Sequence, residues 1–174
     1  MKQLRSKTGA KALRKEWKHN LDSGTQICFL LQEWEDAYNV GGLFRVADGV
    51  GATELVMTGR TPQPPNPMIS VTSIGAHRRI PFRHFEKHDE AAKKLIEEGW
   101  SLIAVEIADN SVNFHEFEFP EKTCLVLGNE ALGVYGSVMK FVSNCVFIPM
   151  FGKGRSLNVH VAAAIVAYQA RLKR

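Results

Sequence analysis

Residues 144–161 read NCVFIPMFGKGRSLNVHV, and this stretch indicates what kind of fold the chain adopts. It begins with an apolar, strand-like run over 145–148, passes Pro149 into a turn with glycines at 152 and 154, and predicts a helix that opens at Ser156. Such a junction exposes backbone N–H groups beside cationic side chains, which suits an anionic or polar ligand. The stretch therefore predicts a ligand-binding turn, with Ser156 as the N-cap of the helix.

The same succession of strand, glycine turn and helix recurs twice, at 39–45 (NVGGLFR) and at 127–133 (LGNEALG). Around these stretches, strand-like runs alternate with helical patterns. Strands are expected near 27–31, 54–57, 81–85, 102–107, 123–127 and 145–148, and helices near 8–19, from 40 onward, and near 90–98, 134–141 and 157–172. This alternation predicts an α/β fold with a mostly parallel sheet and helices on both faces. Ligands of such sheets bind at the carboxyl ends of the strands, where all three stretches fall.

Positive charge is concentrated at the two ends of the chain. The formal net charge is +4, yet residues 1–20 alone carry seven Lys or Arg against one Glu, and three more basic residues lie at 171, 173 and 174. We expect residues 1–25 to form a basic N-terminal helical segment and residues 26–174 to form the main domain. The charge pattern favours a polyanionic partner, most often nucleic acid, while a solubilising helix with a frayed tail is the alternative.

The cysteines and the hydropathy pattern predict a cytoplasmic protein. Cys28, Cys124 and Cys145 lie in apolar runs, and none forms a C-x-x-C pair or has histidines at zinc spacing, so we expect buried free thiols and no metal site. No apolar run reaches about 18 residues, and no N-terminal signal segment is recognised, so we expect no membrane association.

Arg45 lies on a predicted helix face that has little other side-chain cover. By its i, i+3 and i+4 spacing it shares this face with Gly42 and Gly49. Each interior glycine costs a helix roughly 0.5–1 kcal/mol relative to alanine, so the bare surface favours close approach by another backbone, a second subunit or a substrate phosphate. An ordinary solvated arginine is the alternative. For Asn39, just before the glycines, the alternative is a helix cap.

The 127–133 stretch and the final helix carry further candidate groups. Gly128 and Gly133 let the backbone turn tightly near a ligand, and Glu130 is expected near a helix N-terminus, which stabilises a carboxylate. The stretch lacks both the G-x-G-x-x-G of dinucleotide folds and the lysine of a P-loop, so a phosphate-cradling nucleotide site is not expected. The last helix is apolar almost all round, which predicts burial inside the monomer or against a second copy.

In chain order the three stretches follow N-x-G-x-x-x-R, G-x-E-x-x-G and I-P-M…S-L-N. This ordered trio resembles the SpoU/TrmH branch of the SPOUT RNA methyltransferases, over roughly residues 26–170. Two positions depart from the family pattern: Asn129 replaces a frequent serine, and His160 stands where a small polar residue is usual. We expect His160 to be a structural histidine of the helix or of an interface rather than a catalyst.

The resemblance implies an enzyme that transfers a methyl group from S-adenosyl-L-methionine (AdoMet) to a ribose 2′-hydroxyl of tRNA or rRNA, with S-adenosyl-L-homocysteine as the product. It also implies a C-terminal trefoil knot and a homodimer. By motif match the catalytic residues are Arg45, Asn39, Glu130, Ser156 and Asn158, and the cofactor-binding residues are Leu127, Gly128, Asn129, Gly133, Ile148, Met150, Ser156 and Leu157. The basic clusters predict RNA contacts at Arg78, Arg79, Arg83, Lys153 and Arg155.

Arg45 is expected to position the substrate rather than to deprotonate it. An arginine pKa above about 12 makes a poor base, whereas good orientation saves about 7–11 kcal/mol of a reaction barrier. We expect Arg45 to grip the adjacent phosphate and orient the hydroxyl, while a phosphate oxygen or water takes the proton. Two other classes stay open. One is a non-catalytic RNA-binding homologue, and the other is a small-molecule α/β enzyme of Rossmann or flavodoxin type, which the missing phosphate loop disfavours.

Overall fold

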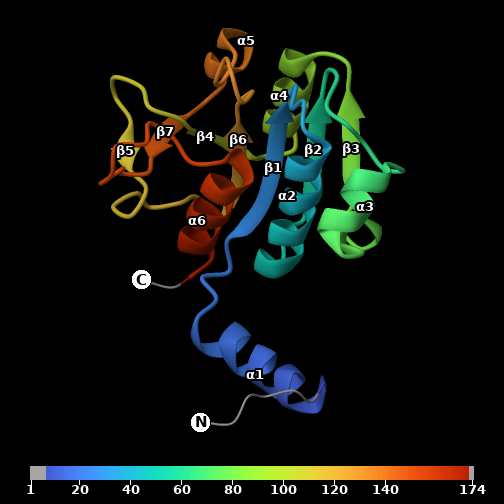
Figure 1. The fold of residues 1–174 in the computed structure, drawn as a ribbon. Helices are drawn as coiled ribbons and strands as arrows, with labels where there is room; N and C mark the ends of the chain where they lie inside the picture. The colour runs from blue at the N-terminus through green and yellow to red at the C-terminus, as the bar shows by residue number, and fades with distance from the viewer. Residues whose placement is uncertain (1–6, 173–174) are drawn as a thin grey trace.

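Within residues 7–172, which this computed structural model describes, seven strands form a single sheet (Figure 1). The strands are β1 (Gln26–Gln32), β2 (Glu54–Thr58), β3 (Phe82–Phe85), β4 (Ser101–Val105), β5 (Val112–Asn113), β6 (Lys122–Leu127) and β7 (Asn144–Phe147). Their order across the sheet is β3-β2-β1-β6-β4-β7-β5, and every neighbouring pair is parallel. The expected α/β sheet is confirmed, and it is entirely rather than mostly parallel.

Helices cover both faces of the sheet, as expected (Figure 1). They are α1 (Lys7–Asn20), α2 (Ala37–Val50), α3 (Pro67–Ser73), the 3₁₀ turn η1 (Ala76–Arg78), α4 (His88–Glu97), α5 (Gly136–Met139) and α6 (Val159–Arg171). Buried side chains of α2, α3 and α6 pack on one face, and those of α4 and α5 pack on the other. In Figure 1, α1 lies below the rest of the molecule, away from the sheet.

The central strand β1 shows why the sheet needs cover on both sides. Ile27, Phe29 and Leu31 point into the core beneath α2 and α6, while Cys28 and Leu30 point into the core beneath α4. Successive side chains of a strand alternate between faces, so a strand with a continuous apolar run, here residues 27–31, is buried on both faces. Each such side chain stabilises the fold by about 1.5–3 kcal/mol when it leaves water.

The strands β1 and β6 are neighbours in the sheet. From β1 the chain proceeds to β2 and β3 at one edge, and the later strands all lie on the other side of β1, so the strand order reverses between β1 and β6. A reversal of strand order leaves a crevice at the carboxyl ends of the strands on either side of it. The turns that follow β1 and β6 therefore lie where a ligand site is expected.

Two predictions about helix ends are wrong, those for Ser156 and Glu130, and the alternative role of Asn39 as a cap is excluded. Helix α2 is capped by Asp36, whose Oδ1 accepts a hydrogen bond from the Tyr38 backbone N–H at 2.8 Å, so Asn39 lies inside the helix rather than at its cap. The cap of α6 is Asn158 and not Ser156, because the Asn158 side chain accepts from the His160 backbone N–H at 3.1 Å. Glu130 lies in a turn, since the next helix begins only at Gly136.

Two elements were not anticipated. Helix α3 begins inside a proline-rich segment, where the Asn66 side chain caps it and Pro67 occupies its first turn. Proline suits that position because the first N–H groups of a helix need no partner within the helix. Strand β5 has only two residues and lies at the edge of the sheet, beside β7. So short a segment carries no periodic signal.

The glycines of α2 admit two other helices to close range. A Cβ on Gly41 would overlap the Thr72 side chain of α3, and a Cβ on Gly42 would lie 2.9 Å from the His160 ring of α6. A Cβ on Gly49 would lie 3.0 Å from the Tyr168 hydroxyl of α6. On the face of Gly42 and Gly49, side chains of α6 make the close approach, not the backbone, second subunit or phosphate that the sequence suggested.

Several smaller expectations concern single residues. The three cysteines are free and buried, as expected. In the part of the chain from 7 to 172, no helix is both long and apolar enough to cross a bilayer, and no group of three metal-ligating side chains gathers. The basic residues at 2, 5, 173 and 174 lie outside the described residues, as does the side chain of Lys7.

Candidate active site

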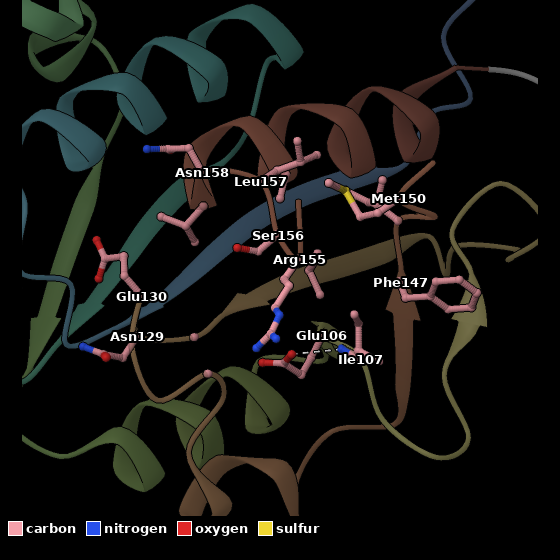
Figure 2. Close-up of a pocket in the computed structure, with 16 residues that line it drawn as sticks. Glu106, Ile107, Asn129, Glu130, Phe147, Met150, Arg155, Ser156, Leu157 and Asn158 are labelled. Atoms are coloured by element: carbon pink, nitrogen blue, oxygen red, sulfur yellow. Dashed lines mark hydrogen bonds between the residues drawn. The ribbon is translucent and has the colours of Figure 1, made fainter. Parts of the chain in front are cut away.

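A cavity of about 520 Å³ opens beyond the carboxyl ends of β4, β6 and β7 (Figure 2). We call it the cleft, and four segments line it: 105–107, 128–133, 147–150 and 155–162. The lining residues are Val105, Glu106, Ile107, Gly128, Asn129, Glu130, Gly133, Phe147, Ile148, Met150, Arg155, Ser156, Leu157, Asn158, Val159 and Ala162. The second and third sequence motifs thus meet in one place, although residues 134–147 separate them in the chain.

Most residues expected to bind the cofactor line the cleft. They are Gly128, Asn129, Gly133, Ile148, Met150, Ser156 and Leu157. Leu127 does not line it, because its side chain is buried in the core at the end of β6. Of the residues expected to be catalytic, Glu130, Ser156 and Asn158 line the cleft, whereas Asn39 and Arg45 do not.

The turn after β6 is held in shape by Asn129. Its Nδ2 donates to the Glu33 carbonyl at 2.7 Å, and its Oδ1 accepts from the backbone N–H groups of Ala131 and Leu132 at 2.9 and 3.1 Å. The turn closes so tightly that a Cβ on Gly128 would overlap the backbone of Gly133. Asn129 is therefore a structural residue of the turn, and its three hydrogen bonds explain an asparagine at this position.

Asn39 joins the three motifs through hydrogen bonds. Its side chain is buried, with 7% exposed. Its Nδ2 donates to Glu130 Oε1 at 3.1 Å, and its Oδ1 accepts from Asn158 Nδ2 at 2.9 Å. The same Oδ1 lies 3.1 Å from His160 Nδ1. One residue from each motif thus takes part in a single hydrogen-bonded cluster beside the cleft.

Arg45 lies in a second hollow, on the surface formed by α2, α3 and the start of α6. This helix hollow has a volume of about 550 Å³ and is lined by Tyr38, Gly42, Arg45, Val46, Val71, Thr72, Ile74 and His160. Arg45 is exposed, and no other described residue pairs with its guanidinium. It is therefore available to an external anion. The helix hollow and the cleft are connected through Asn39, which bonds to Asn158 on one side and to His160 on the other.

Glu106 is a cleft residue that the sequence analysis did not single out. Its Oε1 accepts from the Ile107 backbone N–H at 2.9 Å and its Oε2 from the Val134 backbone N–H at 3.2 Å, so the carboxylate is fixed at the cleft wall. Figure 2 shows Arg155 extending toward it. The signal that could have revealed Glu106 is its position: it is the first residue after β4, at the carboxyl edge of the sheet.

The residues expected to contact RNA fall into two groups. Lys153, Arg155 and Arg78 are exposed, and no ion pair engages them among residues 7–172. Arg79 instead holds Asp48, with a shortest separation of 2.7 Å. Arg83 is held by two carboxylates, those of Glu98 and Glu54, at 2.8 and 2.7 Å. Hydrogen bonding to Glu98 raises the pKa of Arg83, against the effect of burial. RNA contact stays a prediction for all five residues.

Comparison with known proteins gives concordant matches. The model of the SpoU rRNA Methylase family matches residues 26–168. A tRNA (guanosine(18)-2'-O)-methyltransferase of Escherichia coli (strain K12) is 27% identical over 146 residues, which cover 83% of this chain and 62% of that protein. Its counterpart from Aquifex aeolicus (strain VF5) is 31% identical over 143 residues, with 80% and 66% covered.

Among solved structures, the SpoU methyltransferase AviRb from Streptomyces viridochromogenes in complex with AdoMet is similar, with a TM-score of 0.76 at 24% identity. The match covers 83% of this chain and 56% of that one. The likeness confirms the fold. The chain spans less than two thirds of the length of this structure and of the Escherichia coli relative.

Proposed function

The chain belongs to the SpoU rRNA Methylase family, and we propose that it is an RNA methyltransferase that moves a methyl group from AdoMet to a ribose 2′-hydroxyl of tRNA or rRNA. The observation that carries this proposal is the hydrogen-bonded cluster of Asn39, Glu130 and Asn158 at the cleft. It assembles one polar residue from each of the three motifs beside a cavity large enough for a small organic cofactor. The tRNA 2′-O-methyltransferases to which the chain is similar support the same activity.

The cleft fits AdoMet in shape and in charge. Gly128 lines the cleft, and Met150 and Leu157 offer partly exposed apolar surface to an adenine ring. AdoMet carries a positive sulfonium and an ammonium group, and the cleft presents the carboxylates of Glu106 and Glu130 to a ligand of that charge. When bound, AdoMet supplies an electrophilic methyl group. The residues named here bind and orient it, with Glu106 as an acceptor for its hydroxyl or ammonium groups.

Arg45 serves the RNA. Its exposed guanidinium in the helix hollow suits a phosphate, which it can hold through two parallel hydrogen bonds. Gripping the phosphate next to the target ribose fixes the direction of the 2′-hydroxyl. The exposed Lys153 and Arg155 lie on the loop that borders the cleft, and together with Arg78 they extend the positive surface. Phosphate contacts of this kind make RNA binding depend steeply on salt.

The N-terminal segment belongs to the same proposal. In α1 the side chains of Arg14, Lys15 and Lys18 are exposed. We assign residues 1–25 to RNA binding and residues 26–174 to cofactor binding and catalysis. We also propose a cytoplasmic location, where such an enzyme would meet its tRNA or rRNA.

A homodimer and a C-terminal knot are further parts of the proposal. Apolar side chains around the helix hollow stay at least half exposed, namely Tyr38 at 50%, Val71 at 67% and Ile74 at 65%. Exposed apolar groups that gather in one place mark a surface for protein contact, and a second copy would bury these. The knot would thread α6, with the loop that precedes it, through the earlier loops at the cleft. Light scattering of the purified chain tests the dimer.

One experiment tests the function. Calorimetry measures AdoMet binding, and [methyl-³H]AdoMet is then incubated with deproteinised total RNA from cells that lack the protein, followed by digestion to nucleosides. We expect micromolar binding and label in 2′-O-methylnucleosides. Label in a methylated base would contradict the ribose assignment. Binding of RNA without any binding of AdoMet would instead favour the non-catalytic homologue.

A further inference from the structure

Arg155 brings a positive charge into the cleft. Among residues 7–172, no other lysine, arginine or histidine lines this cavity. The Arg155 side chain is exposed, and no hydrogen bond or ion pair within the same range engages its guanidinium. In Figure 2 the side chain extends toward Glu106. The described residues therefore present one unpaired guanidinium to a ligand of the cleft.

Glu106 supplies a negative group that faces Arg155 without pairing with it. Its two carboxylate oxygens accept from the backbone N–H groups of Ile107 and Val134, at 2.9 and 3.2 Å, so the carboxylate is held in place. A carboxylate oxygen has two lone pairs, so each oxygen can accept a further hydrogen bond from a ligand. A fixed carboxylate and an unpaired guanidinium thus face the same part of the cleft.

The charges of AdoMet match these two groups. At neutral pH the molecule has a positive sulfonium, a positive ammonium and one negative carboxylate, and the last two are attached to the same carbon atom. A guanidinium in the cleft repels the two positive groups, so it favours binding only if it pairs with the carboxylate. Arginine suits a carboxylate well, because its planar fork donates two parallel hydrogen bonds.

We propose that Arg155 binds the carboxylate of the methionine part of AdoMet, and that it thereby makes the cleft select donors with an intact amino-acid group. The inference rests on the proposed function and deepens it. Glu106 is the matching acceptor for the ammonium of the same part of the molecule. The product S-adenosyl-L-homocysteine keeps the carboxylate, so Arg155 holds the product as well as the donor.

This role differs from the RNA contact that the sequence predicted for Arg155. Lys153 is exposed on the same loop and does not line the cleft, whereas Ser156 and Leu157, which follow Arg155 directly, do line it. The loop thus enters the cleft at Arg155, two residues after Lys153. Lys153 remains with the RNA surface. The charge of Arg155 adds to that surface only until the carboxylate of AdoMet neutralises it.

Calorimetry with three ligands tests the proposal on the full chain, without any need for activity. The ligands are AdoMet, S-adenosyl-L-homocysteine and decarboxylated AdoMet, which lacks only the carboxylate. We expect wild type to bind AdoMet about 10-fold more tightly than the decarboxylated donor. In Arg155→Gln, AdoMet and S-adenosyl-L-homocysteine should bind about 10-fold more weakly, while the affinity for the decarboxylated donor should not fall.

The third ligand separates binding of the carboxylate from support of the loop. If Arg155 only held the loop in shape, its loss would weaken all three ligands alike. The matched control is Lys153→Gln, which removes one positive charge from the same loop and should bind all three ligands as wild type does. With AdoMet at saturation, fluorescence anisotropy should show weaker RNA binding for Lys153→Gln and wild-type RNA binding for Arg155→Gln.

The possible failures can be told apart. Equal weakening of AdoMet and the decarboxylated donor in Arg155→Gln would overturn the role of Arg155 and leave the proposed function standing. Unchanged AdoMet affinity together with weaker RNA binding would return Arg155 to the RNA surface. A wild-type protein that prefers AdoMet to the decarboxylated donor but methylates no RNA would overturn the proposed function alone. A wild-type protein that binds no AdoMet would overturn both.

Discussion

The cleft and the helix hollow are built in different ways. The cleft is formed by turns that follow three neighbouring parallel strands, and each turn is a short, contiguous piece of sequence. The helix hollow is formed by side chains of α2, α3 and α6, which lie more than 100 residues apart at the extremes, at 38 and 160. The cleft therefore depends on backbone shape at a few glycines, and the hollow depends on which side chains helix packing brings together.

Because the two regions are built differently, we expect a substitution in one region to impair the function of that region alone. Changes in the turns should reduce cofactor binding, whereas changes in the helix hollow should reduce the handling of RNA with little effect on the cofactor. Asn39 links the two regions, since its amide bonds to Glu130 and Asn158 at the cleft and to His160 in the hollow. Variants that hit one region alone are the sharpest way to test the division.

The largest effect is expected for Gly128→Ala, in the cleft. The added methyl group would overlap the backbone of Gly133, and backbone cannot step aside as a flexible side chain can. Overpacking typically costs 1–3 kcal/mol, so a turn forced open should weaken AdoMet binding by about 100-fold. Calorimetry measures the affinity. Gly136→Ala is the matched control, because nothing lies within 4 Å of its Cβ position. Wild-type affinity in Gly128→Ala would show that the turn does not contact the cofactor.

The next effect is expected for Arg45→Lys, in the helix hollow. Lysine keeps the charge but loses the two parallel N–H donors that match a phosphate. Hydrogen bonds to charged groups contribute about 1.5–3 kcal/mol, so kcat/KM for RNA should fall about 10–100-fold while AdoMet affinity stays within twofold. Arg60→Lys, at an exposed arginine outside both regions, is the control. Near-normal turnover in Arg45→Lys would count against the grip on phosphate.

A smaller effect is expected for Glu106→Gln, again in the cleft. The amide keeps the size of the carboxylate but removes its charge, and we expect AdoMet to bind about 10-fold more weakly, which corresponds to ~1.4 kcal/mol. RNA binding should not change. Glu118→Gln makes the same charge change at an exposed site away from the cleft. If Glu106→Gln weakens RNA binding and leaves AdoMet binding unchanged, the Glu106 carboxylate serves the RNA and not the cofactor.

The contrast between the two regions also explains what the sequence could and could not predict. The strands and the glycine-containing turns of the second and third motifs were recognisable because each depends on a local pattern, alternation of apolar segments or spacing of glycines. The meeting of these two turns in one cleft followed from parallel strands sharing one carboxyl edge, whereas the first stretch, 39–45, lies inside α2 and does not line the cleft. The cap of α6 was misplaced by two residues, at Ser156 instead of Asn158, because both side chains are good caps and only the backbone decides between them.

Local sequence patterns could not predict the helix hollow. Gly42 and His160 are 118 positions apart, and nothing in either segment indicates that the ring of one packs on the backbone of the other. Arg45 was correctly separated from the apolar side of its helix, but whether it would lie in the cleft or beside it depends on how α2 packs on α6. The same reason applies to Arg83, whose position in a basic cluster gave no sign of the two carboxylates that hold it.

The smallest effect is expected for Arg83→Met, on β3 at the sheet edge remote from the cleft. This variant tests whether a loss of stability alone changes the affinity for AdoMet. Hydrogen bonding from Arg83 lowers the pKa of Glu98 from its usual 4.5. A carboxyl whose pKa is lowered by folding stabilises the fold above its unfolded pKa, and this contribution is lost as the pH falls below about 4.5. Partly exposed ion pairs contribute up to about 1 kcal/mol each. Denaturant unfolding should therefore show Arg83→Met less stable than wild type by about 1 kcal/mol at pH 7, with the gap closing toward pH 3, whereas Arg45→Met should show no such pH-dependent gap. Unchanged AdoMet affinity in Arg83→Met would show that a loss of stability of this size does not weaken cofactor binding. The losses of AdoMet affinity expected for Gly128→Ala and Glu106→Gln could then be attributed to the cleft.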